Sequence, residues 1–203
     1  MTFTEQDRER ISAAIRAAET RTSGEIICVL ARSSSGTTAI PLVIASIAAL
    51  ALPWALVAFT AMPVYRILTL QVVTFVVLAA LLYLPPVHAA LLPRRTRRAL
   101  AHQAAMQQFR SRGLTRKKDR TGILIFVSLA ERYARIVADE GIAARVPQTQ
   151  WQSAVDSLIA HAREGHIADG FIGAIEWCGN ELARHFPRTE GSRDELPDRI
   201  YLI

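Results

Sequence analysis

The 53-residue stretch from Ile40 to Leu92 is the feature that most constrains what this chain can fold into. It carries one formal charge, Arg66, and 41 of its residues are hydrophobic. Arg66 divides it into the spans Ile40–Met62 and Ile67–Leu84, each close to the ~20 apolar residues that a helix needs to cross a bilayer. The other 150 residues are too few to enclose two helices that are apolar on every face. The stretch therefore predicts two transmembrane helices.

Trp54 lies inside the first span, deeper than the interfacial position that tryptophan usually takes. Two interpretations remain open for it: an interfacial ring, or a side chain that faces a helix partner. Pro53 precedes it, and a helix within a bilayer tolerates the kink that this proline would cause.

The N-terminus does not resemble a signal peptide, because Met1–Ile11 is rich in charged residues where an apolar segment would have to begin. The first span is therefore expected to be an uncleaved anchor. Ten basic residues and one acidic residue lie between positions 94 and 120, whereas the connection between the spans holds only Arg66. The positive-inside rule then predicts two spans in the inner (cytoplasmic) membrane, with both termini in the cytoplasm.

The basic cluster directly after the second span suggests contact with anionic lipid headgroups, at about 1 kcal/mol per basic residue. The residues nearest the membrane are Arg94, Arg95, Arg97 and Arg98. Nucleic acid is the competing partner for such a cluster. No interleaved aromatic residues or nucleic-acid-binding motif accompany it, so a bilayer and a protein partner in the membrane are expected instead.

The residues outside the hairpin come in two pieces that predict one α/β domain. In the first, a helix opens on a capping pattern at Thr4–Asp7 and a buried strand covers Glu25–Leu30. In the second, the pattern predicts a helix over 94–111, strands over 123–127 and 133–138 joined as an antiparallel hairpin, and two final helices. The expected fold is a layered α/β sandwich with a small mixed sheet flanked by helices, interrupted by a transmembrane helical hairpin.

The predicted domain organisation follows from this order. Residues 1–38 form the first part of the α/β domain and 39–93 the transmembrane hairpin. Residues 94–188 form the second part of the domain, and 189–203 a C-terminal tail. Ile200–Ile203 could pair with a sheet edge or with a partner, and the pattern does not choose between them.

Several short motifs, taken in order, resemble the TPM-domain family. They are Thr22–Ile26, Thr121–Val127, Glu131–Tyr133, Asp139–Ile142, Asp169–Ile175 and His185–Pro187. Better-known members of that family include thylakoid-lumen proteins of photosystem II repair and a nematode receptor-associated membrane protein. The resemblance implies an α/β sandwich that is often tethered to a membrane. Some members are described as acid phosphatases or as binding calcium, and others as assembly or interaction partners.

Two departures from the family pattern bear on function. Members usually carry an acidic pair just before the first helix, and here Thr2–Asp7 has no adjacent aspartates. Hard cations need several oxygen ligands, so this loss weakens the case for an inherited metal site. Typical members are also exported and tethered by a C-terminal span, whereas this chain carries its hairpin within the domain.

Few residues suggest chemistry. The sequence has no Walker loop, GxSxG, HExxH or GxGxxG motif. Cys28 and Cys178 lie on apolar patterns and are expected to be buried structural thiols. His161 and His166 are expected at the surface. Glycines at 170 and 173 are expected to permit close approach of another backbone.

Glu25, Asp119 and Asp139 are the candidate ligands of a cation site. Glu25 begins one predicted strand and Asp139 ends another, so oxygen ligands for Ca²⁺ or Mg²⁺ would meet if both ends lie on one edge of the sheet. The alternative is that Glu25 and Asp139 cap turns and face solvent. No catalytic residue and no other cofactor is predicted.

Two functions therefore stay open at the level of sequence. The first is a membrane-anchored interaction module for the assembly or maintenance of a membrane complex. The second is a divalent-cation-dependent phosphatase at the membrane surface, for which the cation site would be required.

Overall fold

The computed structural model describes residues 3–33, 39–84, 93–114, 120–188 and 197–203. The chain divides into two compact units. One contains Met1–Ser35 together with Arg98–Ile203, and the other contains Gly36–Arg97. Each unit is described by itself.

The first unit opens with α1 (Glu5–Glu19), whose start follows the predicted capping pattern. The hydroxyl of Thr4 accepts the Asp7 N–H at 3.2 Å, and the Asp7 carboxylate accepts the Thr4 N–H at 3.0 Å. These reciprocal bonds satisfy two backbone donors that a helix start leaves open. The capping box is therefore confirmed, and it fixes where α1 begins.

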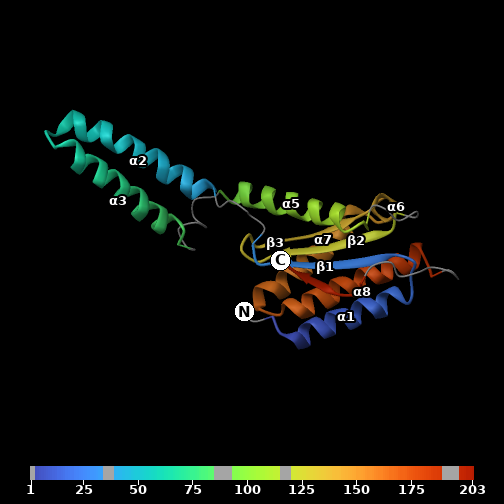
Figure 1. The fold of residues 1–203 in the computed structure, drawn as a ribbon. Helices are drawn as coiled ribbons and strands as arrows, with labels where there is room; N and C mark the ends of the chain where they lie inside the picture. Colours follow the sequence, from blue (N-terminus) through green and yellow to red (C-terminus); the bar gives the residue numbers. More distant parts are fainter. Residues whose placement is uncertain (1–2, 34–38, 85–92, 115–119, 189–196) are drawn as a thin grey trace. The chain divides into compact units, whose positions relative to one another are not determined.

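A four-stranded mixed sheet forms the centre of this unit, in the order β3-β2-β1-β4 (Figure 1). β1 (Glu25–Ala31) pairs in parallel with β2 (Gly122–Ser128), and β2 pairs antiparallel with β3 (Tyr133–Ala138). β4 (Ile200–Leu202) pairs in parallel with the other side of β1. β1 and β2 are buried along their whole length, as their continuous apolar sequences predict. β4 also shows that the C-terminal residues pair within the chain.

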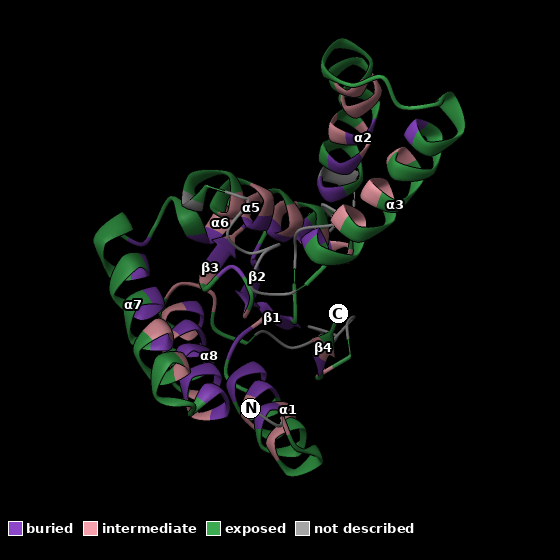
Figure 2. Ribbon diagram, turned by 90° about the vertical axis from the view of Figure 1, so that its left-hand side faces the viewer, coloured by how far each residue is buried: buried purple, intermediate pink, exposed green. Residues whose placement is uncertain are grey.

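Helices cover both faces of the sheet (Figures 1 and 2). α5 (Arg94–Ser111) packs Ala105 and Phe109 on one face. α1, α7 (Gln148–Glu164) and α8 (Ile167–His185) pack on the other. A short helix, α6 (Glu140–Ala143), follows β3. The predicted α/β class with a small mixed sheet flanked by helices is confirmed.

The two glycines expected to permit close approach behave differently. A Cβ on Gly170 would lie 3.0 Å from the His161 Cβ and 3.2 Å from the Leu158 carbonyl oxygen, so α7 does approach this position closely. A Cβ on Gly173 would meet nothing within 4 Å. The expectation for Gly173 was wrong because its face of α8 is exposed. The second close approach of another element to α8 lies instead at Gly179, where a Cβ would come within 2.7 Å of the Ala18 Cβ on α1.

The second unit consists of α2 (Ala39–Phe59) and α3 (Val64–Leu82), which lie side by side as a hairpin (Figure 1). Both are long and apolar enough to cross a membrane, over Pro41–Phe59 and Val64–Leu82, and little of either segment is buried by protein. Large apolar side chains are exposed along both helices, and Trp54 is 80% exposed. Trp54 therefore does not pack against α3, and both interpretations, an interfacial ring or a side chain that faces a helix of a partner, stay open.

Candidate functional site

Glu25 and Asp139 lie at the same end of the sheet. Glu25 is paired with Gly122, the first residue of β2, and the Asp139 N–H donates to the Gly122 carbonyl oxygen at 2.9 Å from the other side. The two acidic residues therefore flank one strand, which is the arrangement that the predicted cation site requires. Asp119 lies outside the described residues.

Neither acidic side chain faces solvent as the alternative supposed, since Glu25 is 2% and Asp139 8% exposed. Asp139 does cap a helix, because its Oδ1 accepts the Glu140 N–H at the start of α6. Its Oδ2 and the Thr121 hydroxyl are buried and have no hydrogen-bond partner among the described residues. Buried oxygen atoms of this kind suit a hard cation. Within the described residues, however, no group of three or more His, Cys, Asp or Glu side chains is arranged to hold a metal ion.

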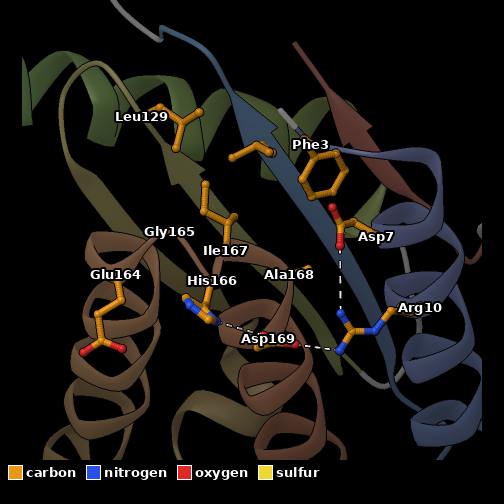
Figure 3. Close-up of a pocket in the computed structure, with 11 residues that line it drawn as sticks. Phe3, Asp7, Arg10, Leu129, Glu164, Gly165, His166, Ile167, Ala168 and Asp169 are labelled. Carbon is orange, nitrogen blue, oxygen red and sulfur yellow. Dashed lines mark hydrogen bonds and ion pairs between the residues drawn. The ribbon is translucent and has the colours of Figure 1, made fainter. Parts of the chain in front are cut away.

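A pocket of about 270 Å³ lies at the opposite end of the sheet (Figure 3). Leu30 near the end of β1 and Leu129 after β2 place it at the carboxyl ends of the two parallel strands, where ligands of α/β proteins usually bind. Glu25 marks the amino end of β1 instead, so the carboxyl-end rule favours this pocket over the predicted cation site. The other lining residues come from the start of α1 and the α7–α8 junction: Phe3, Asp7, Arg10, Glu164, Gly165, His166, Ile167, Ala168 and Asp169.

Four polar side chains of this pocket, Asp7, Arg10, His166 and Asp169, form one network. The Arg10 guanidinium donates to Asp169 Oδ1 at 2.6 Å and lies 3.9 Å from an Asp7 oxygen (Figure 3). His166 Nδ1 lies 3.5 Å from the other Asp169 oxygen. The hydrogen bond from Arg10 holds the pKa of Asp169 below its usual value, and the bonds with Thr4 do the same for Asp7. Both carboxylates are therefore ionised at neutral pH.

This pairing limits the chemistry of the pocket. An ionised aspartate cannot donate a proton, and an aspartate with both oxygens engaged is a poor nucleophile. None of the described residues that line the pocket is a serine, threonine or cysteine. The network instead ties α1 to the first turn of α8, where a carboxylate also interacts favourably with the helix dipole. Sequence reasoning missed it because Arg10 and Asp169 are 159 positions apart, and the motif that contains Asp169 does not indicate a partner on α1.

Glu19 is a second buried acid that sequence reasoning missed. It ends α1 at 4% exposure, and its Oε1 accepts the Ile26 N–H of β1 at 2.8 Å. Burial, reinforced by the carboxyl of Asp198 and opposed by the Ile26 hydrogen bond, raises its pKa to about 8. A glutamate at the end of an amphipathic helix normally faces solvent, so no signal in the sequence distinguished it.

The cysteines and histidines lie where the sequence predicts. Cys28 and Cys178 are buried free thiols, and burial raises the pKa of both. A thiol with a raised pKa is a weak nucleophile at neutral pH. His161 and His166 are exposed.

The fold and these sites define an α/β domain with a mixed four-stranded sheet, joined to two helices that are apolar enough to span a membrane. Residues 90–180 match the family model of the TPM domain, so the resemblance predicted from the motifs is confirmed. The structure is similar to the NMR structure of the BA42 protein from the psychrophilic bacterium Bizionia argentinensis, with a TM-score of 0.61 and 20% identity. The match covers 100% of this chain and 96% of that one. A comparison with curated proteins found no match.

Proposed function

We propose that this chain is a membrane-anchored interaction module that assists the assembly or maintenance of a membrane complex. The observation that carries the proposal is the joining of a TPM-type α/β domain to two exposed apolar helices. Such helices bury their side chains in lipid, and the domain is then held at the membrane surface. Asp7, Arg10, His166 and Asp169 of its carboxyl-end pocket are engaged with one another, which supports binding rather than turnover.

The same proposal includes an orientation. The basic residues of 94–120 and the single charge between the spans favour both termini in the cytoplasm, with the chain in the cytoplasmic membrane. Arg95 and Arg98 are exposed at the start of α5, and their charge supports contact with anionic headgroups. The side chain of Arg94 is not among those described.

The proposal predicts that the chain solubilised from its native membrane in mild detergent migrates on a blue native gel as part of a complex. The expected size exceeds that of the purified recombinant chain in the same detergent. Co-migration of the native and recombinant chains would contradict an interaction role.

A cation-dependent phosphatase is the rival proposal. It is favoured by the position of Glu25 and Asp139 on either side of Gly122 and by the name of the matching family model, TPM phosphatase. Hydrolysis of p-nitrophenyl phosphate with and without Ca²⁺ or Mg²⁺ tests it. The rival predicts cation-dependent turnover that Glu25→Ala and Asp139→Ala abolish, with the exposed neighbour Glu140→Ala as the control. The interaction proposal predicts no turnover that depends on either residue.

A further inference from the structure

The outer edge of β3 is open within the described part of the chain, because β2 is its only paired neighbour there. The Asp139 N–H bonds to Gly122, and hydrogen-bonded pairs alternate along an antiparallel ladder. In the observed register, Ala134, Ile136 and Ala138 therefore direct their backbone N–H and C=O groups away from β2. Such an edge is a template for one more strand.

A groove of about 760 Å³ runs along this edge. The apolar side chains Trp151, Val155 and Ile159 of α7 line one side, and Arg98 and Met106 of α5 line the other. A second hollow of about 510 Å³ continues it past Tyr133 toward the β2–β3 turn. β3 has six residues, so a strand of matching length would span about 20 Å.

The groove is positively charged, which favours an acidic occupant. Among the described residues that line it, four are arginines and one, Asp156, is acidic. The arginines are Arg98, Arg132, Arg135 and Arg163. None of these guanidinium groups is ion-paired to a described residue, whereas Asp156 accepts a hydrogen bond from Gln152 at 2.9 Å. Burial and the charge of Arg135 lower the pKa of the neighbouring His102. A second copy of β3 would place like charges against each other, which is unfavourable.

We infer that the β3 edge binds an acidic extended segment of a partner protein, which adds to the sheet as a fifth strand. Side chains of an added strand alternate between the two faces of the sheet. Every second side chain would lie toward Arg135 and α5, where an acidic residue is favoured. The side chains between them would lie toward the apolar wall of α7, where an apolar residue is favoured. The segment therefore alternates acidic and apolar residues. This inference rests on the proposed interaction role and names the surface that performs it.

A labelled peptide tests the inference directly. The probe is a fluorescein-labelled peptide of alternating glutamate and valine, titrated by anisotropy against the full chain in neutral detergent. We expect saturable binding, and no binding of the matching lysine–valine peptide. The double variant Arg135→Glu/Arg163→Glu should bind at least ~10-fold more weakly. Arg16→Glu, an exposed arginine on α1, is the control and should bind as the wild type does.

Backbone pairing is tested on the wild-type protein, so that a misfolded variant cannot decide the result. The same peptide N-methylated at every second amide, made in both registers, should lose binding in at least one register, because methylation removes the donors that the edge requires. Equal binding of all the peptides, equal binding to the double variant, or no saturable binding would overturn the inference.

Binding to anionic vesicles tests the alternative occupant, a lipid. If the wild type binds these vesicles, the double variant does not, and the peptide binds neither protein, the groove is a lipid site and the inference is overturned. In any of these cases a native complex on the blue native gel would leave the interaction role standing.

Discussion

At the scale of single residues, Glu19 shows how a buried carboxyl connects elements distant in sequence. It lies between the start of β1, through Ile26, and the segment that leads into β4, through Asp198. With a pKa of about 8 it holds a proton at neutral pH. A neutral Glu19 carries no charge that a neighbouring acid would repel, and this makes the proximity of another carboxyl tolerable.

The Glu19→Gln variant should reveal this proton. The wild-type folded state keeps it up to pH about 8, whereas the unfolded chain loses it near pH ~4.5. Stability from this group is therefore complete below the unfolded pKa and is lost as the pH rises through about 8, by about 5 kcal/mol at most. Glutamine cannot titrate, so the variant should lose this pH dependence and should be the more stable form at pH 9. Thermal melting at pH 5 and pH 9, followed by tryptophan fluorescence, measures it. Parallel pH profiles for the two proteins would contradict the assignment.

The candidate site was only partly predictable at this scale. The places of Glu25 and Asp139 at strand ends could be predicted from the sequence, whereas their position at the same end of the sheet was only a condition of the cation site. Their burial was not predictable, because it depends on tertiary packing. The ion pair of Arg10 with Asp169 was unpredictable for the same reason, since two exposed charges 159 positions apart leave no local pattern.

At the scale of elements, most boundaries could be predicted from local signals. The capping box set the start of α1, and Gly165, in the left-handed conformation with φ 90°, ends α7. The continuous apolar sequence of β2 and the short link to β3 predicted the antiparallel β2–β3 hairpin, which is observed. The partner of β4 was not predictable, because three residues carry little pattern and parallel pairing with β1 is decided by tertiary packing. α6 is a single turn after Asp139 and was missed.

The crossing of α1 and α8 depends on Gly179. Gly179→Ala places a methyl group 2.7 Å from the Ala18 Cβ, and overpacking of this kind destabilises by ~1–3 kcal/mol. Gly173→Ala is a matched control on the same helix, because its Cβ meets nothing within 4 Å. It should stabilise by ~0.5–1 kcal/mol, since alanine is the better helix former. Thermal melting of both variants tests the pair, and equal effects would contradict the assigned close contact.

At the scale of the whole molecule, the chain is an α/β fold whose sequence is interrupted by an apolar hairpin. The α/β unit is assembled from both sides of that interruption, because neither the α1–β1 piece nor the later piece forms the central pair of strands alone. α2 and α3 belong to the separate unit Gly36–Arg97. The interruption therefore falls between two strands that become sheet neighbours.

The central claim is that the hairpin anchors the chain while the rest folds as one domain, and alkaline carbonate extraction of membranes tests it most directly. The full chain should stay in the membrane pellet. A variant in which Gly36–Arg97 is replaced by a flexible Gly/Ser linker should be found in the supernatant and should melt cooperatively, because β1 and β2 retain their pairing. Release of the full chain by carbonate, or an aggregated variant without a cooperative transition, would contradict the account.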